Sequence, residues 1–526
     1  MQLASWLREC SSCYIGNATA KRDYRVQLRG NRAVLLWTLY LIVLIGFAMA
    51  VYGNTMQVSR QSIVSAQSSL RSFYQSVMIL LAGVVVVITP ALTAGAIVME
   101  RQRHSLDLVF SAPVKPKYLL IGKMISSYRY TWMLLILSLP VTSACVVLGG
   151  ATWSDVISAY IILSLNALIY TSIALLLSTL ARQPVSAVIW SYVAAIGYSI
   201  FSAAFVGSSA FSMGFGRTME MPFVVTLNPF FVVQSAPSFT TWQGHQIPNW
   251  ILGGITALLF SKLMLLGAGS ALSGYGSPET KSLRIHCWIY SGLAFALYGY
   301  AASASVSRIV HITGRTGPGF TSSVSSSTSW ESGVNQMFGW ILMAMVVFLP
   351  AITCYGRDGE RKFWPDGLFS WKATFLGTPA GALPFIYGIV LVGFFSLNLV
   401  YGQIGSTAMG FSILFWALAF WTFMWSLGRL ASSFNSGLRS ARALHFTLMM
   451  MLIALPVPFL SALSTFDSDS SSIWDIYILR PILGSHDNSG YAWVMGGIMI
   501  VAAFLVTAIA TVLGARKGSI EAKGAA

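Results

Sequence analysis

Charged side chains are scarce in this sequence. Only 9% of its 526 residues are charged, whereas 56% are hydrophobic and the mean hydropathy is +0.70. Ordinary soluble domains carry about 25% charged residues, so the composition excludes that class. We therefore expect an integral membrane protein.

Motifs for binding phosphate or metal are also lacking. No Gly-x-x-x-x-Gly-Lys-Ser/Thr loop occurs, so the backbone cradle that P-loop proteins use for nucleotide phosphates is missing. We do not expect the chain to hydrolyse ATP by itself in that manner. Neither a histidine and cysteine cluster nor a nucleophile with its base is recognisable. The sequence predicts that the chain is not an enzyme and binds no metal or other cofactor.

Acidic residues are few, and their placement disfavours ion-coupled transport. All 16 lie in predicted loops or at the edges of predicted spans. A carrier driven by protons or sodium usually needs a carboxylate inside the membrane that changes its charge or binds the ion. A secondary carrier is therefore less favoured, although it stays an alternative.

Cysteine is rare as well. Of the five cysteines, Cys10 and Cys13 form a single CxxC without a second pair or nearby histidines to complete a tetrahedral metal site. We expect these cysteines to be incidental, with acylation or redox chemistry as the other readings.

Long apolar runs dominate the rest of the sequence. Twelve of them can cross about 30 Å of hydrocarbon, which takes roughly 20 helical residues. In the first half they run from Ala33 to Tyr52, Ser76 to Met99, Tyr130 to Gly150, Val156 to Leu180, Val185 to Phe205 and Trp250 to Gly269. In the second half they run from Cys287 to Val306, Gln336 to Tyr355, Leu383 to Tyr401, Met409 to Leu427, Leu444 to Leu463 and Tyr491 to Leu513. The fold expected is an all-α membrane protein with twelve transmembrane helices.

The basic residues predict the orientation of these spans. With both termini in the cytoplasm, all but six of the 32 lysines and arginines lie inside, as the positive-inside rule requires. The six outside are Arg60, Arg71, Arg217, Arg308, Arg315 and Arg480. The net charge of +16 is then mostly an orientation signal, and juxtamembrane basic residues would attract anionic lipid rather than nucleic acid. The first 30 residues are polar and basic, so we expect no cleavable signal peptide.

Two pairs of similar segments suggest an internal duplication. Ser111-Ala112-Pro113 precedes Gly122 as Gly377-Thr378-Pro379 precedes Gly388, with nine residues from proline to glycine in each case. Leu227-Asn228-Pro229-Phe230 likewise resembles Leu479-Arg480-Pro481-Ile482. Such echoes indicate two six-helix repeats. The domains expected are a basic amphipathic arm (1–32), a first half (33–270), a cytoplasmic joint (271–286), a second half (287–513) and a tail (514–526).

The stretch from Met99 to Pro113, after the second span, is the most specific local sequence. If helical, it places Leu106, Val109 and Phe110 on one face and sets Arg103 four residues before Asp107. Such a helix could be held by a soluble partner, or it could be a solvated helix that caps the span. The residues alone leave both readings open.

This region resembles the permease subunit of type-two ABC exporters. The resemblance rests on Thr89-Pro90-Ala91-Leu92-Thr93-Ala94-Gly95-Ala96-Ile97-Val98-Met99-Glu100-Arg101, Ser105-Leu106-Asp107-Leu108, Ser111-Ala112-Pro113, Gly122-Lys123 and the arm Lys21-Arg22-Asp23-Tyr24-Arg25 through Ala33. It implies that a separate ABC ATPase, in two copies that bind ATP and magnesium, docks on a coupling helix around Glu100 to Phe110. The residues expected to couple are Glu100, Arg101, Arg103, Leu106, Asp107, Leu108 and Val109, with Glu360 and Arg361 in the second half.

The second half departs from this pattern. Its loop from Gly356 to Gly367 lacks the Leu-Asp-Leu element, so equivalent docking at both halves does not follow. The same loop faintly resembles the Asp-Arg-x-Gly-Arg loop of major-facilitator carriers. We interpret it as a basic anchoring loop that could also contribute to docking.

Two proline segments are candidates for an exoplasmic gate. Asn228-Pro229 and Arg480-Pro481 each precede the last span of their half. Proline interrupts a helix there, so short half-helices could close a pathway where their backbone is buried in protein. A plain interfacial loop is the other reading.

The resemblance and the composition together predict a permease of an ATP-driven exporter in the cytoplasmic (inner) membrane. Its partners would be the ATPase subunits and membrane lipid. A secondary carrier, a membrane assembly protein and a permease-like sensor stay open as alternatives.

Overall fold

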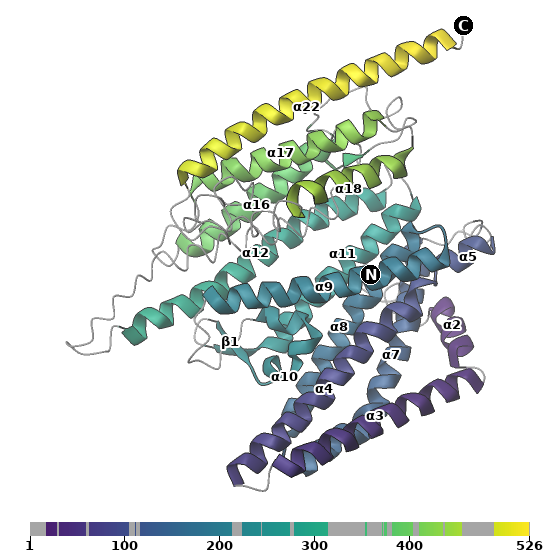
Figure 1. The fold of residues 1–526 in the computed structure, drawn as a ribbon, viewed down its shortest axis with the longest axis vertical. Coiled ribbons are helices and arrows are strands. Elements are labelled where there is room, and N and C mark those ends of the chain that lie inside the picture. Colours follow the sequence, from purple (N-terminus) through teal and green to yellow (C-terminus); the bar gives the residue numbers. More distant parts are fainter. Residues whose placement is uncertain are drawn as a thin grey trace, which may run out of the picture. The chain divides into compact units, whose positions relative to one another are not determined.

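Nearly all ordered elements of the computed structural model are helices (Figure 1). The structure describes residues 17–28, 31–58, 63–104, 111, 116–212, 223–242, 245–273, 278–313, 353–354, 371, 373–375, 381–402, 410–434, 437–454 and 489–524. The chain divides into two units, Met1–Val206 with Arg217–Gly274, and Gly207–Gly216 with Tyr275–Ala526.

Unit 1 is built from long helices and one short irregular region. Its long helices are α3 (Asn31–Val58), α4 (Ile63–Ala94), α7 (Pro116–Val147), α8 (Trp153–Leu180), α9 (Pro184–Ser212, the end of which belongs to unit 2) and α11 (Asn249–Ser273). The shorter elements are α2 (Ala18–Leu28), α5 (Val98–Gln102), η2 (Phe223–Leu227), η3 (Pro229–Phe231), α10 (Val232–Ser235), β1 (Phe239–Trp242) and β2 (His245–Pro248).

Local sequence explains where several helices begin. Pro116 and Pro184 are the first residues of α7 and α9, positions where the missing N–H of proline costs nothing. Helix α8 begins with a capping box, in which the Thr152 side chain accepts from Asp155 N and the Asp155 carboxylate accepts from Thr152 N.

Helix α8 lies at the centre of unit 1. It packs against α4, α7 and α11, and most of its side chains are buried. Helix α3 packs against α4 and α7, and together these elements enclose an apolar core that includes Leu44, Met78, Leu81 and Ile162. By contrast, the outer faces of α3 and α9 expose large apolar side chains such as Ile42 and Trp190. Apolar helices that expose such side chains are suited to lipid rather than water.

Unit 2 contains five described helices. They are α12 (Pro278–Thr313), α16 (Ala382–Gly402), α17 (Phe411–Phe434), α18 (Leu438–Ala454) and α22 (Ser489–Gly524). Helix α17 packs against α16, α18 and α22, and its Trp416, Phe420 and Trp421 are almost completely buried. Helix α12 packs against α16.

Eight helices in the described part of the chain are long and apolar enough to cross a membrane. They are Val34–Gly53, Gln67–Gln102, Lys117–Val147, Trp153–Leu180, Asn249–Ser273, Ala382–Leu399, Phe411–Phe434 and Gly490–Leu513. Each coincides with a predicted span, which confirms a mostly helical membrane protein.

The other four predicted spans are not among these eight. Two coincide with shorter apolar helices in the described residues, Pro184–Ile200 and Ser440–Ile453. The span from Cys287 to Val306 lies on α12, and that from Gln336 to Tyr355 lies almost wholly outside the described residues. The count of twelve therefore stays a prediction.

The structure differs from the sequence-based expectation in two further places. Strands β1 and β2 form an antiparallel hairpin, with Phe239 opposite Pro248 and Trp242 opposite His245, so the fold is not strictly all-α. These strands have only four residues each, too few for an alternation of polar and apolar residues to predict them. Helix α7 begins at Pro116, well before the predicted span, which begins at Tyr130. The prediction began late because Lys117 and Lys123 lower the apolar content of the first turns of the helix.

Candidate functional site

The end of α4 is separated from α5 by a turn. Helix α4 ends at Ala94, α5 begins at Val98, and Ala96 N donates to Thr93 O at 3.0 Å in a tight turn between them. The regular ladder resumes when Met99 N donates to Gly95 O. The amides of Ile97 and Val98 fall in the interruption and need other acceptors.

Helix α8 supplies those acceptors. Ser178 Oγ accepts from Ile97 N at 3.1 Å and from Val98 N at 3.4 Å. Arg101 donates from Nη2 to Thr179 O at 3.0 Å and from Nη1 to Ala181 O at 3.1 Å. These two carbonyls lie at the C-terminal end of α8, where backbone acceptors lack helical partners. Helix α5 is therefore fixed to the end of α8 by four hydrogen bonds.

A cluster of four charges joins α5 to α7 and α2. Lys123 Nζ lies 2.6 Å from both Glu100 Oε1 and Asp23 Oδ2, and the Lys123 side chain is only 9% exposed. Arg22 contacts the same carboxylates, with Nη2 at 3.0 Å from Glu100 and Nε at 3.1 Å from Asp23. The hydrogen bond to Asp23 is the main reason why the pKa of Arg22 is raised. Two cations and two carboxylates thus compensate one another in a partly buried place.

Helix α2 is held on the first turns of α7. Asn17 directly precedes α2, its Oδ1 accepts from Ala20 N at 3.3 Å, and its Nδ2 donates to Tyr118 O at 2.9 Å. Thr19 and Asn17 lie so close to Gly122 that any side chain at that position would overlap them. Farther along, Tyr24 hydroxyl contacts Met133 Sδ at 3.9 Å. We call α2, α5 and the first turns of α7 the α5 corner.

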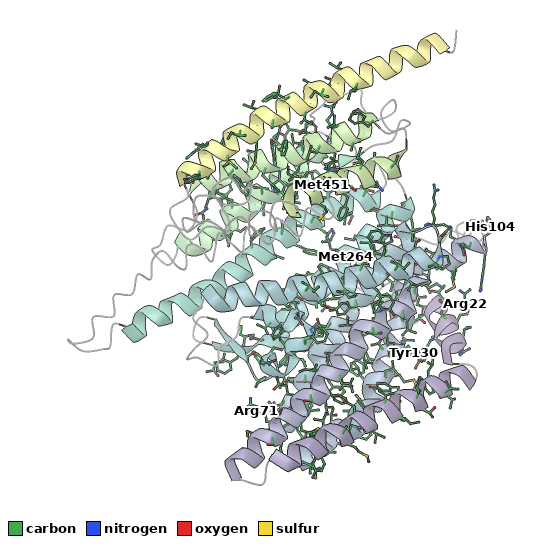
Figure 2. All side chains as sticks on the ribbon, viewed as in Figure 1. Arg22, Arg71, His104, Tyr130, Met264 and Met451 are labelled. Atoms are coloured by element: carbon green, nitrogen blue, oxygen red, sulfur yellow. The ribbon has the colours of Figure 1, made fainter. Side chains whose placement is uncertain are left out.

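The predicted coupling residues have different surroundings at this corner. Glu100 and Arg101 point inward, toward Lys123 and toward the α8 carbonyls respectively, whereas Arg103 is exposed. Helix α5 ends at Gln102, and His104 has φ = +54°, so the helix expected from Glu100 to Phe110 is interrupted there. Histidine tolerates this left-handed conformation better than most residues. Figure 2 shows His104 at the tip of α5 and Arg22 on α2 at the same end of unit 1.

The other predicted coupling residues lie outside the described residues. These are Leu106, Asp107, Leu108 and Val109 after α5, and Glu360 and Arg361 in unit 2. Their docking roles stay predictions.

The predicted gate residues Asn228 and Pro229 belong to a buried run of short helices. We call η2, η3 and α10, from Phe223 to Ser235, the short-helix segment. Asn228 is the N-cap of η3, its Oδ1 accepts from Phe230 N at 2.9 Å, and Pro229 is the first helical residue. Asn228 Nδ2 also donates to Ser199 O at 3.0 Å and to Ser202 Oγ at 2.9 Å on α9. An Asn-Pro cap therefore fixes the start of η3 against α9.

The backbone of the short-helix segment is bonded by side chains from the long helices. Asn166 Nδ2 on α8 donates to Thr226 O at 2.8 Å, and Tyr198 hydroxyl on α9 donates to Leu227 O at 2.9 Å. The Thr226 side chain also packs directly against Gly253 of α11, where any side chain would overlap it. Because Asn166 is near the middle of α8, the segment enters the bundle to about half its depth. Irregular backbone is tolerated at that depth only when protein groups satisfy it.

The counterpart Arg480 and Pro481 lie outside the described residues, so a matching segment in unit 2 stays a prediction. Within the described part of the chain, no three histidine, cysteine, aspartate or glutamate side chains group as a metal site.

Sequence reasoning missed four residues that organise this unit, namely Asp23, Lys123, Asn166 and Ser178. Asp23 and Lys123 occur in the segments that carry the family resemblance, but the sequence predicted no role for either. The signal available for Lys123 was that it is a lysine in a helix that is otherwise apolar on that turn. Ser178 and Asn166 resemble many other polar residues of membrane helices, and nothing in the sequence singles them out.

Comparison with known proteins locates the family in the first half. Residues 18–269 match the family described as "ABC-2 family transporter protein", a range that begins with α2 and includes the α5 corner and the short-helix segment. No curated protein matches the sequence. The apolar helices and this match indicate a multi-pass membrane protein. This match identifies the first half of the chain as an ABC-2 family transporter region and indicates a membrane permease component of an ABC transporter.

Proposed function

We propose that the chain is the complete membrane part of an ATP-driven exporter. ATP and magnesium bind to separate ABC ATPase subunits, two per chain, which dock on its cytoplasmic side in the inner membrane. Hydrolysis on those subunits shifts the membrane helices between inward-facing and outward-facing states through differential binding to the two states.

The observation that supports this proposal most strongly is the fastening of the α5 corner. A helix of five residues cannot transmit force unless it is fixed to larger elements. Here α5 is joined to α8 through Ser178 and Arg101 and to α7 and α2 through the charge cluster. Arg103 follows at an exposed position, where a soluble subunit can reach it. The corner thus combines an accessible contact point with a rigid connection to the bundle.

Charge placement supports an external energy source. Among the described residues, Asp23 and Glu100 lie at the α5 corner, and Asp155 caps the opposite end of α8. Glu279 lies in the first turn of α12 and Glu521 in the last turn of α22. None of these carboxylates is near the middle of a helix that could span the membrane, where ion-coupled carriers usually bind their ion. The proposal also includes the remaining predicted sites. The ATPase contacts Leu106 to Val109 and a second loop at Glu360 and Arg361. The exoplasmic gates lie at Asn228-Pro229 and Arg480-Pro481.

The test is purification of the tagged chain in mild detergent from its native host. Proteins that co-purify are identified by mass spectrometry, and ATPase activity is measured in the same sample. We expect an ABC ATPase at about two copies per chain, as the fused twelve-span arrangement requires. Repeated recovery of a monodisperse chain without an ATPase would refute the proposal and favour a secondary carrier.

An exposed charge provides a sharper variant. Arg103→Ala should lower ATPase recovery several-fold while the chain stays monodisperse, because the side chain is exposed and its loss removes no interior contact. Arg129→Ala, at a half-buried position on α7 in the same unit but beyond the corner, is the control and should retain the ATPase. Equal recovery from the wild-type chain and Arg103→Ala would remove Arg103 from the docking surface.

A further inference from the structure

Helix α8 makes polar contacts with both functional regions of unit 1. Near its C-terminal end, Ser178 accepts the two amides of the α4–α5 turn. Near its middle, Asn166 donates to Thr226 O in the short-helix segment. The two residues are 12 positions apart in one helix, which corresponds to about 18 Å along its axis. A single continuous helix therefore connects the α5 corner with the short-helix segment.

Ser178 contacts the turn at which the helical hydrogen bonds between α4 and α5 are interrupted. Between Ala94 and Val98 the helical hydrogen-bond ladder is interrupted, so α4 and α5 are joined by a turn rather than by a rigid helix. The amides of Ile97 and Val98 have Ser178 Oγ as their acceptor, and Arg101 adds two bonds to the end of α8. Separating α5 from α8 would leave buried amides without acceptors, which is unfavourable. Helix α5 should consequently move with α8 more readily than with α4.

The contact at Asn166 is similarly protected from water. Asn166 is 1% exposed, Ser178 is fully buried, and Thr226 is 4% exposed. Water cannot easily replace a hydrogen bond in such surroundings, so a shift of α8 would either carry the Thr226 carbonyl with it or leave it unsatisfied. Tyr170, between the two positions, adds a bond of 2.7 Å to Ser199 on α9, and Ser199 O in turn accepts from Asn228.

We propose that α8 transmits displacement of α5 to the short-helix segment, with Ser178 and Asn166 as the positioning residues at its two contacts. The inference rests on the proposed function, because α5 is displaced by the docked ATPase. A chain of contacts does not by itself establish energetic coupling, so the test measures the response of one end to a change at the other.

The experiment compares backbone hydrogen exchange in the purified complex of the full chain and its ATPase. Exchange is measured by mass spectrometry without nucleotide and with ATP plus vanadate, which traps the nucleotide-bound state. In the wild-type complex we expect nucleotide to change exchange in peptides from Phe223 to Ser235 while Ile97 and Val98 stay protected. In Ser178→Ala we expect the nucleotide-dependent change in the short-helix segment to fall about fivefold or more.

Two further variants distinguish transmission from general damage. Ser172→Ala is the matched control, because Ser172 is a fully buried serine of the same helix whose Oγ donates to its own helical carbonyl, Ile169 O. It should leave the nucleotide response unchanged. Ser178→Thr keeps the hydroxyl and should restore most of the response. If Ser178→Ala fails to fold, Asn166→Leu tests the other contact. It should abolish the response of the short-helix segment while Ile97 and Val98 stay protected.

The outcomes separate this inference from the proposed function. If no ATPase binds the wild-type chain, the proposed function fails and the inference fails with it. If the ATPase binds and Ser178→Ala or Asn166→Leu responds like the wild type, only the inference is overturned. Loss of protection at Ile97 and Val98 in the nucleotide-bound wild type would also overturn it, because α5 would then have left α8.

Discussion

The helix contacts around Gly122 in unit 1 and Gly388 in unit 2 share a backbone arrangement but differ in chemistry. Gly122 is the seventh residue of α7 and Gly388 the seventh of α16. Each leaves room for a side chain of the preceding N-terminal helix, Thr19 from α2 in unit 1 and Trp288 from α12 in unit 2. The sequence echo from proline to glycine therefore corresponds to a similar close approach of helices.

The polar groups beside these two contacts are not alike. Next to Gly122 lies Lys123, which is paired with two carboxylates. Next to Gly388 lies Ile389, and the buried cation there is Arg284 of α12, which donates to Thr374 O at 2.7 Å and stacks 5.1 Å from the Phe385 ring centre. Trp288 Nε1 donates to Phe385 O at 3.0 Å and fixes the indole. Among the described residues, both contacts therefore have a close approach at a glycine, whereas the carboxylate pair that holds a lysine lies beside Gly122.

The largest expected effect comes from removing the buried cation in each unit. Lys123→Met leaves Asp23 and Glu100 close together, and we expect a loss of about 3 kcal/mol, the low end for a broken buried ion pair because Arg22 remains. Arg284→Met removes the donor to Thr374 O, a hydrogen bond from a charged group to a neutral carbonyl, and should cost about 1–2 kcal/mol. Both losses are measured by thermal unfolding in detergent, with the remaining monodisperse protein as the readout. Lys117→Met, at an exposed position of α7, is the control. Equal losses for Lys123→Met and Arg284→Met would contradict the difference between the units.

A smaller effect should follow from filling the two glycine positions. Gly388→Ala places a Cβ against Trp288, whose Cε2 would lie 2.5 Å away, and the indole is held by its own hydrogen bond. Gly122→Ala meets the polar end groups of Asn17 and Thr19. We expect each to cost about 1–3 kcal/mol through overpacking, measured as a lower unfolding temperature.

The control for the glycine pair is Gly83→Ala. Gly83 lies in α4 and a Cβ there meets nothing within 4 Å, so alanine should be neutral or slightly stabilising. Gly122→Ala should also release α2 from α7, which limited proteolysis of the arm would detect. If both glycine variants behave like Gly83→Ala, the close approach is not what the echo preserves.

The smallest effect is expected at the exposed member of the charge cluster. Arg22 is 61% exposed, so Arg22→Gln should cost about 0.5 kcal/mol or less, and the loss should diminish in high salt. Lys21→Gln, next to it on α2 and also exposed, is the control. The measurement is the unfolding temperature at low and high salt. A loss that is large and independent of salt would show that Arg22 acts through packing rather than charge.

Much of the helical fold could be predicted from the sequence, because the residue patterns that indicate helices are local. Apolar length located the helices α3, α4, α7, α8, α11, α16, α17 and α22 that can span a membrane. Asn228-Pro229 was correctly singled out as a break, since an asparagine cap followed by proline starts a new short helix. The helix after Glu100 was expected to run on, and its interruption at His104 depends on a backbone conformation that no residue pattern specified.

The candidate site was harder to predict from the sequence, because its contacts join distant parts of the chain. Glu100 was singled out as a docking residue, yet its carboxylate contacts Lys123 and Arg22. Arg101 was expected to face a partner, and its guanidinium instead bonds the end of α8. The motif located the corner, but it did not distinguish the inward side chains from the exposed Arg103. The direction of a side chain depends on which helix lies beside it, and that is a property of the bundle.

The sequence by itself determined that this is a membrane protein and where most of its helices lie. Apolar length, prolines and caps act within a few residues, and a lipid environment forces such segments to satisfy their backbone as helices. Only the tertiary structure decided that Ser178 would accept the amides of a turn 81 residues earlier and that Asn166 would bond a carbonyl 60 residues later. Apolar helices offer many nearly equivalent neighbours, so polar partners become identifiable only once close packing has brought particular helices together.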